Sequence, residues 1–354
     1  MKRVGYLYEK IISVDNLNAA LDKACLKKKH KYFVKRILDN RDYYMQKLHE
    51  ELEAGTYRFH ANITKTIQER SSQKQRDLTI PKFYPDQIIH WAVCIQLAPI
   101  IMRGMYHYSC GSIPGRGCVY GKKYVDWILK NDKKAKYVLK LDIRKFFQTV
   151  STDKLKELLR RKIKDAKALR LIDAILDNGS PGLPIGYYTS QWFSNFYLEP
   201  LDHFIKEALK IRHYIRYVDD MVLIDTNKRK LHRARQQIVA FLQDGGYNCT
   251  IKDNWQLWRL HSRPLDFMGY RFYKDRTLLR KRIFYALNRK VRLVKKRGYC
   301  TVRSARAIAS EMGWLKRIPG GRHYYLNHIK PVISKGEISR IISAYDKKTR
   351  RNKP

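Results

Sequence analysis

The chain has 354 residues, with 74 Lys and Arg against 32 Asp and Glu, so its formal net charge is +42. A charge of this size repels itself unless a polyanion is bound, which favours a nucleic-acid partner. The basic residues are spread along the whole chain, and this favours a long basic channel over a disordered basic tail. Hydrophobic residues make up 44% of the chain, enough for a substantial core without covalent cross-links.

The six cysteines exclude two classes of small domain. They form neither a C-x-x-C pair nor a cluster with His, so neither a zinc ribbon nor a disulfide framework is indicated. The N-terminus lacks the apolar segment of a signal peptide, and no apolar stretch approaches the roughly 18 residues that span a bilayer. We therefore expect reduced cysteines in a cytoplasmic protein with no membrane partner.

Residues 1–70 are predicted to form basic, amphipathic helices. In the stretch YFVKRILDNRDYYMQKLHEEL, apolar side chains at helical spacing are expected on one face, namely Phe33, Ile37, Tyr44, Leu48 and Leu52. Residues 71–135 combine an extended basic segment (QKQRDLTIP), an apolar helix (DQIIHWAVCIQLAPIIM) and a Gly-rich loop (SCGSIPGRG).

Residues 136–275 alternate between predicted strands and helices. KYVLKLDIRKFF and HYIRYVDDMVLID are short and rich in β-branched and aromatic residues, which favours strands. Between them, TDKLKELLRRKIK predicts a charged helix, and a longer helix is expected to begin near Thr189. Residues 276–354 are predicted to form a basic helical bundle, because RKRIFYALNRKVRLVKKRG carries apolar residues at helical intervals. These apolar residues are Ile283, Leu287, Val291 and Val294.

Three aspartates carry the chemical signal. Asp142 follows one predicted strand, and Asp219 with Asp220 lies where a tight hairpin would present both carboxylates. An isolated Asp-Asp pair is usually a turn or capping feature. Here the flanking residues are apolar, and carboxylates in apolar surroundings are costly without a compensating cation. If the strands are neighbours, the three carboxylates could hold the paired divalent ions that phosphoryl transfer uses.

YVDD and LDIRKFF resemble the two metal-binding motifs of reverse transcriptases. The resemblance runs in order over residues 70–320 and implies an α+β right-hand polymerase, with fingers, a palm containing an antiparallel sheet, and a helical thumb. The implied division is a basic helical N-terminal extension (1–70), fingers (71–135), palm with fingers insertions (136–275), and a helical thumb with a basic tail (276–354).

The resemblance implies two Mg²⁺ ions, for which Mn²⁺ can substitute. Asp142, Asp219 and Asp220 would be the catalytic metal ligands, together with the backbone carbonyl of Ile143. Asp142 and Asp219 are expected to bridge both ions. Whether Asp220 is a weaker ligand or mainly orients the site stays open.

Further motifs resemble the nucleotide pocket and the primer grip of the same family. Phe147 would be the steric gate against a ribose 2′-hydroxyl, with a plain core aromatic as the alternative and Phe146 as the better core candidate. Lys252 would lie near the triphosphate and act as a general acid, with an ordinary exposed lysine as the alternative. The other implied nucleotide-binding residues are Lys74, Arg76, Ile185, Gly186 and Gln191. The implied primer grip is a hairpin of Phe267, Met268, Gly269 and Tyr270.

One departure from the commoner family pattern narrows the resemblance. Ile185 stands where intron and retroviral enzymes usually carry Gln, and the form I-G-x-x-x-S-Q is similar to reverse transcriptases of diversity-generating retroelements. A branched aliphatic side chain removes a hydrogen-bonding contact to the nucleotide, so base selection would depend more on shape. We therefore expect reduced fidelity.

The implied partners are a structured template RNA, the RNA/cDNA duplex, dNTPs and a small oligomeric accessory protein, in a bacterial cytoplasm. A defence-associated bacterial reverse transcriptase is an alternative within the same enzymes. A catalytically silent RNA-binding scaffold is an alternative from another class, and the three intact aspartates argue against it. An RNA-dependent RNA polymerase is also conceivable, although Phe147 as a gate disfavours it.

Overall fold

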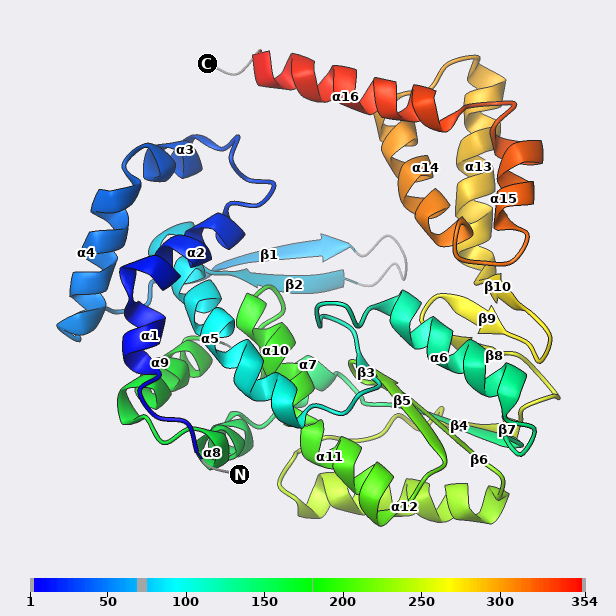
Figure 1. The fold of residues 1–354 in the computed structure, drawn as a ribbon, viewed down its shortest axis with the longest axis horizontal. Helices are drawn as coiled ribbons and strands as arrows, with labels where there is room; N and C mark the ends of the chain where they lie inside the picture. Colours follow the sequence, from blue (N-terminus) through cyan, green and yellow to red (C-terminus); the bar gives the residue numbers. More distant parts are fainter. Residues whose placement is uncertain (1–2, 69–74, 180, 352–354) are drawn as a thin grey trace. The chain divides into compact units, whose positions relative to one another are not determined.

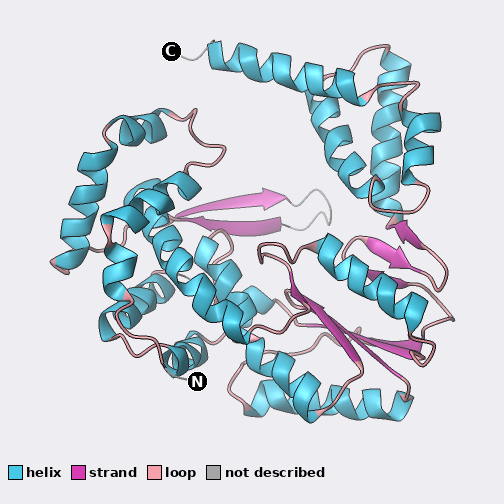
Figure 2. Cartoon of the chain, in the orientation of Figure 1, coloured by secondary structure: helices cyan, strands magenta, loops and turns pink. Residues whose placement is uncertain are grey.

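The computed structural model describes residues 3–68, 75–179 and 181–351 (Figures 1 and 2). Helices and strands alternate along most of this length, as expected for an α+β protein. The chain divides into two compact units. The first unit consists of Met1–Pro114, Lys140–Leu223 and Arg229–Trp255, and the second of Gly115–Leu139, Ile224–Lys228 and Gln256–Pro354.

The chain begins with four helices, α1 (Tyr8–Ile12), α2 (Val14–Ala24), α3 (Tyr32–Asp39) and α4 (Arg41–Glu53). The predicted helices are present, and the stretch that begins at Tyr32 divides into α3 and α4 because the backbone leaves the helical region at Asn40 (φ −122°, ψ 40°). Arg41 then fastens α4 to α2 by donating to the Asn18 carbonyl at 2.8 Å and to Asp22 at 3.0 Å.

The buried face of α3 and α4 differs from the predicted face at two positions. Leu48, Leu52 and Ile37 are buried as predicted. Phe33 is instead 45% exposed and Tyr44 is only half-buried, while the neighbouring Val34 and Met45 are fully buried. Spacings of three and four residues both fit a helical face, so the helical period alone does not decide between these neighbours.

A hairpin follows, formed by β1 (Ile63–Gln68) and β2 (Gln75–Ile80) in antiparallel register. The expectation of helices up to residue 70 is therefore wrong for β1, whose β-branched sequence ITKTIQ favours a strand. After the short π-helical turn η1 (Phe83–Gln87), the predicted apolar helix is present as α5 (Ile88–Gly104). It packs against α1, α2 and α10.

A five-stranded sheet with the order β3-β5-β6-β4-β7 contains both predicted central strands (Figure 2). Its strands are β3 (Ser109–Cys110), β4 (Tyr137–Asp142), β5 (His213–Tyr217), β6 (Asp220–Asp225) and β7 (Gln256–Arg259). The short β3 runs parallel to β5. The β-branched and aliphatic residues of β4 and β6 are buried, which explains why these runs form interior strands.

The first unit contains further helices. They are α7 (Phe146–Thr149), α8 (Thr152–Lys162), α9 (Ala166–Asp177), α10 (Tyr188–Tyr197), α11 (Glu199–His203), η2 (Phe204–Ala208) and α12 (Lys228–Asp244). Of these, α9 lies beside both α1 and α8 (Figure 1). The predicted charged helix is α8, and the helix expected near Thr189 begins at Tyr188. Nearly every side chain of α10 is buried, so this helix is fixed by packing along its whole length.

The second unit contains a three-stranded sheet of order β10-β9-β8 and a helical bundle. Its other elements are α6 (Cys118–Asn131), β8 (Leu265–Phe267), β9 (Tyr270–Phe272), β10 (Thr277–Leu279), α13 (Lys281–Arg297), α14 (Val302–Leu315), α15 (Gly321–Tyr324), η3 (Tyr325–Ile329) and α16 (Lys335–Arg351). The predicted basic helix is α13, which buries Leu287, Val291 and Val294.

Two further expectations concern cysteines and membranes. All six cysteines carry free thiols, and four of them are buried. Among the described residues, no helix combines the length and the apolar character that crossing a membrane would require.

Candidate active site

The three aspartates lie on neighbouring strands of the five-stranded sheet. Strands β5 and β6 form a hairpin that turns at Val218 and Asp219, and Asp220 begins β6. Strand β4 is the neighbour of β6 and ends at Asp142. The predicted hairpin and the predicted neighbouring of the two strands are both confirmed. The carboxylates are thus brought together although Asp142 is far from the other two in sequence.

Two lysines are paired with these carboxylates. Lys252 Nζ lies 2.6 Å from Asp142 Oδ1, and the backbone N–H of Lys252 donates to the Asp142 carbonyl at 2.8 Å. Lys140 Nζ lies 3.2 Å from Asp220 Oδ2. The other oxygen of Asp220, Oδ1, is buried and has no hydrogen-bond partner among the described residues. One carboxylate oxygen is therefore available for a ligand that the chain itself does not supply.

Burial and mutual repulsion set the electrostatics of the site. Burial raises the pKa of Asp220 to about 7, against the lowering effect of Lys140 and with further raising by Asp142 and Asp219. Burial also raises the pKa of Asp219, and the negative charge of Asp142 adds to this effect. Ionised carboxylates in such a place are unfavourable without a nearby cation.

The donor set fits a hard divalent cation, because Mg²⁺ prefers carboxylate and carbonyl oxygens. In the segments that the structure describes, no three His, Cys, Asp or Glu side chains are gathered closely enough to form a metal cage. Lys252 and Lys140 each hold one of the carboxylates. A metal ion would compete with the lysines for these oxygens.

The segment from Gly182 to Gly186, part of the predicted nucleotide pocket, is hydrogen-bonded to two other parts of the first unit. The Leu183 N–H donates to the Phe147 carbonyl at 2.6 Å, and the Thr79 N–H on β2 donates to the Ile185 carbonyl at 2.8 Å. A Cβ at Gly182 would lie 2.4 Å from the Phe147 carbonyl oxygen, and a Cβ at Gly186 would lie 2.4 Å from the Thr79 carbonyl oxygen. Both glycines have positive φ, so this close approach requires them.

Phe146 and Phe147 differ as the sequence suggested. Phe146 is only 2% exposed and belongs to the core, whereas Phe147 is half-buried. Arg76 is exposed on β2, and its positive charge lowers the pKa of Asp219, which places it within electrostatic reach of that carboxylate. Gln191 is exposed near the start of α10. The predicted triphosphate ligand Lys74 lies outside the described residues.

Residues 67–272, more than half of the chain, match the family described as reverse transcriptase (RNA-dependent DNA polymerase). The chain belongs to the reverse transcriptase family. Its fold is the right-hand polymerase fold of that family, and its five-stranded sheet carries the paired aspartates in a hairpin beside the strand that ends at Asp142.

Individual relatives cover less of the chain. The group II intron-encoded protein LtrA of Lactococcus lactis subsp. cremoris is 30% identical over 171 residues, which are 46% of this chain and 28% of LtrA. Protein YkfC of Escherichia coli strain K12 is 26% identical over 175 residues, covering 46% of this chain and 45% of YkfC. The matched part thus spans less than half the length of either relative.

Solved structures of telomerases are similar at low sequence identity. The apo telomerase of Candida tropicalis truncated from its C-terminal domain is 13% identical, with a TM-score of 0.46 over 63% of this chain and 55% of that chain. The telomerase of Candida albicans in complex with a fragment of telomeric RNA is 11% identical, with a TM-score of 0.46 over 85% of this chain and 62% of that chain.

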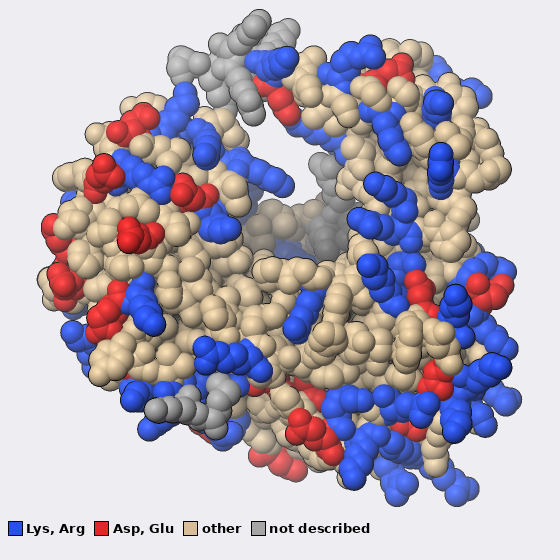
Figure 3. Space-filling model, in the orientation of Figure 1, with Lys and Arg blue, Asp and Glu red and all other residues tan. Residues whose placement is uncertain are grey.

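The predicted primer-grip hairpin of this reverse transcriptase is present in the second unit. Strands β8 and β9 are joined by Met268 (φ 50°) and Gly269 (φ 84°), and Phe267 and Tyr270 are buried on either side. The grip function itself stays a prediction. Basic side chains occur on both units of the reverse transcriptase (Figure 3), in keeping with the charge of the whole chain.

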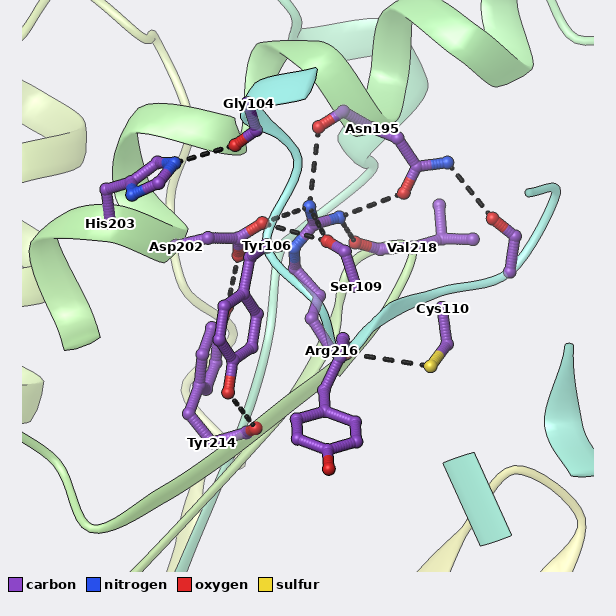
Figure 4. Close-up of polar contacts among 12 residues, drawn as sticks. Gly104, Tyr106, Ser109, Cys110, Asn195, Asp202, His203, Tyr214, Arg216 and Val218 are labelled. Atoms are coloured by element: carbon purple, nitrogen blue, oxygen red, sulfur yellow. Dashed lines mark hydrogen bonds and ion pairs between the residues drawn. The ribbon is translucent and has the colours of Figure 1, made fainter. Parts of the chain in front are cut away.

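A buried polar network that was not predicted from the sequence lies beside the aspartate hairpin (Figure 4). Arg216 on β5 is completely buried and pairs with Asp202 on α11, which is also completely buried. Asn195 on α10 and Ser109 on β3 complete the network. One signal was visible in the sequence, since an arginine within the apolar strand HYIRY must find a partner when it is buried.

The raised pKa of Asp220 leads to a prediction about stability. A carboxyl group with a higher pKa in the folded chain opposes folding increasingly as pH rises between its unfolded and folded values. For Asp220 this interval runs from 3.8 to about 7. Without metal, Asp220→Asn should therefore gain thermal stability relative to wild type across this interval, reaching a Tm advantage of about 2–4 °C above it.

Added Mg²⁺ should raise the Tm of wild type at about pH 8 and have little effect on Asp220→Asn. Differential scanning fluorimetry measures both effects, with Asp244→Asn, an exposed aspartate on α12, as the control. An equal Mg²⁺ shift in wild type and Asp220→Asn would contradict the assignment of Asp220 to a cation site.

Proposed function

We propose that this reverse transcriptase is an active RNA-directed DNA polymerase that copies a structured template RNA into cDNA. The observation that carries the proposal is the convergence of Asp142 with the Asp219–Asp220 hairpin on neighbouring strands. Membership of the reverse transcriptase family supports this proposal. The charge of +42 supports it too, because a nucleic-acid template and product are polyanions that bind to a basic protein.

Asp142, Asp219 and Asp220 would hold two Mg²⁺ ions, or Mn²⁺ in their place, with the backbone carbonyl of Ile143 as a further ligand. When bound, the ions supply activation of the primer 3′-hydroxyl and stabilise the charge that develops on the leaving pyrophosphate. The buried, unpaired Oδ1 of Asp220 supports this assignment.

The chain's own residues would bind and orient the nucleotide. Arg76 and Lys74 would hold the triphosphate, because charge-assisted donors suit phosphate oxygens. Lys252 Nζ, which lies beside Asp142, would be released from this carboxylate and donate a proton toward the leaving pyrophosphate. Phe147 would exclude a 2′-hydroxyl.

The rest of the pocket and the primer strand complete the proposal. Ile185, Gly186 and Gln191 would line the pocket around the incoming nucleotide. The hairpin of Phe267, Met268, Gly269 and Tyr270 would grip the primer strand of the RNA/cDNA duplex.

We further propose that the enzyme serves a diversity-generating retroelement in a bacterial cytoplasm, with a small oligomeric accessory protein as partner. The sequence form around Ile185 supports this role. The Ile185 carbonyl accepts a hydrogen bond from the Thr79 N–H on β2, the strand that also carries Arg76, and this supports a role of Ile185 beside the incoming nucleotide. An aliphatic side chain at this point would make base selection less strict.

Primer extension on an RNA template with Mg²⁺ and dNTPs tests the polymerase. Asp219→Ala/Asp220→Ala should reduce the rate by about 1000-fold or more, since metal-held charge stabilisation is worth several kcal/mol. Asp39→Ala/Asp244→Ala, at two exposed aspartates, is the matched control and should retain activity. cDNA synthesis by Asp219→Ala/Asp220→Ala at the wild-type rate would refute the proposal. A wild type that makes no cDNA, even when supplied with native flanking RNA and neighbouring gene products, would also refute it.

Replacement of Phe147 tests the steric gate. Phe147→Ala should lower the ratio of kcat/KM for dNTPs to kcat/KM for rNTPs by about 100-fold, because the smaller side chain admits the 2′-hydroxyl. Phe146→Leu, which perturbs the buried neighbour, should lower thermal stability without changing this ratio. Steady-state kinetics with both nucleotide types decides, and an unchanged ratio in Phe147→Ala would remove the gate assignment.

The fidelity prediction concerns Ile185. Ile185→Gln should lower misincorporation by about 10-fold, because the amide restores a hydrogen-bonding contact to the nucleotide. Sequencing of cDNA made by wild type, Ile185→Gln and the aliphatic control Ile185→Val measures the error rate at each template base. Errors concentrated at template adenines in wild type would support the diversity-generating role, whereas equal error rates in all three enzymes would contradict a role of Ile185 in fidelity.

A further inference from the structure

The turn between β5 and β6 contains a backbone conformation that its own residue disfavours. Val218 has a φ of 57°, in the left-handed region, which a β-branched residue rarely adopts. The two following residues are Asp219 and Asp220, so the direction of both carboxylates depends on this conformation. Something outside the turn must hold it, because Val218 alone would favour an extended backbone.

Two hydrogen bonds hold Val218, one at its backbone N–H and one at its backbone carbonyl. The Val218 N–H donates to the carbonyl of Cys110 on β3 at 3.0 Å. The Val218 carbonyl accepts a hydrogen bond from Nη1 of Arg216 at 2.7 Å. The first bond continues the short β3–β5 pairing, whereas the second comes from a side chain and depends entirely on where that side chain is fixed.

Arg216 is fixed by using all of its hydrogen-bond donors inside the protein (Figure 4). Nε and Nη2 form a bidentate pair with the carboxylate of Asp202, at 2.7 and 2.5 Å. Nη1 also donates to Asn195 Oδ1 at 3.2 Å, and Nη2 donates to Ser109 Oγ and to the Asn195 carbonyl. The guanidinium therefore has one possible orientation, and in that orientation Nη1 points at the Val218 carbonyl.

The same network reaches the start of α10. Asn195 Nδ2 donates to the carbonyl of Gln191 and to the carbonyl of Gly111, each at 3.0 Å. Asp202 also accepts from the hydroxyls of Ser109 at 2.8 Å and Tyr214 at 2.7 Å. Because Arg216, Asp202, Asn195 and Ser109 are all buried and linked by these hydrogen bonds, the turn is tied to β3, α10 and α11 at once.

We propose that Arg216 is a positioning residue that holds Val218 in the left-handed conformation and so aims Asp219 and Asp220 at the cation site. Arg216 does not contact substrate; it acts through the backbone of the turn. The proposal rests on the proposed function, since the carboxylates matter as metal ligands only in a polymerase. A lysine could not replace it, because one ammonium cannot hold Asp202 bidentately and also reach Asn195 and Val218.

The test separates positioning from simple stabilisation by removing the whole ion pair. Arg216→Met/Asp202→Asn leaves no lone buried charge and keeps an acceptor for the Ser109 and Tyr214 hydroxyls, so thermal stability should stay near wild type. Hydrogen exchange of the metal-free protein should become faster in the peptide that contains Val218 and stay unchanged in segments outside the Arg216 network. In primer extension kcat should fall by about 10–100-fold with little change in KM for dNTPs, and the Mg²⁺ midpoint should rise.

The matched control is Arg160→Met/Asp173→Asn, which removes an ion pair between α8 and α9 in the same unit. It should change neither the exchange of the Val218 peptide nor kcat. If Arg216→Met/Asp202→Asn fails to fold, Arg216→Lys takes its place with the same expected local effect. Adding Val218→Gly to either variant should recover part of kcat, because glycine adopts positive φ without strain.

The proposal would be overturned if Arg216→Met/Asp202→Asn or Arg216→Lys left both the hydrogen exchange at Val218 and kcat unchanged. Arg216 would then be a stabilising residue only. Exchange and Mg²⁺-dependent thermal stabilisation need no polymerase activity. If wild type made no cDNA, the proposed function would fail while the exchange measurement would still decide the role of Arg216.

Discussion

The gathering of negative charge in a partly dehydrated site is the constraint on which the rest of this structure depends. Burial and the neighbouring carboxylates raise the pKa values of Asp219 and Asp220, so the folded chain keeps these groups at a cost that packing elsewhere must offset. Lys252 and Lys140 partly compensate the charge by holding Asp142 and Asp220. Apolar residues at these positions would be more favourable for stability alone. We therefore interpret the cluster of carboxylates as a functional site.

The surrounding fold serves to fix this charge cluster. Strands β4 and β6 are neighbours, which brings Asp142 to the hairpin. The segment that contains Gly182 and Gly186 runs from Phe147 to β2, and the two glycines allow backbone atoms to approach closely. Behind the hairpin, Arg216 and Asp202 form a fully buried ion pair. Arg76 on β2 is exposed and suited to bind phosphate. The buried pair of Arg216 and Asp202 has the different, proposed role of setting the backbone geometry of the hairpin.

The sequence predicted the parts that depend on local pattern. The β-branched runs around YVDD and LDIRKFF identified two interior strands, and the apolar flanks of the aspartates indicated a cation site. Local pattern was less reliable in α3 and α4. Asn40 separates the two helices, and the helical period did not decide between Phe33 and Val34 as the buried residue. The Arg216 network was beyond reach, because its partners Asp202 and Ser109 lie on other elements and nothing in their spacing shows that they meet.

The central claim is that Asp142, Asp219 and Asp220 together hold divalent ions for nucleotidyl transfer. Anomalous diffraction from crystals of this reverse transcriptase with Mn²⁺, a primer on an RNA template and a non-hydrolysable dNTP analogue tests it most directly. The account predicts Mn²⁺ peaks within bonding distance of Asp142 and the hairpin carboxylates, with Lys252 displaced from Asp142. Peaks only at other sites, with both lysine pairs intact beside a bound nucleotide, would contradict it.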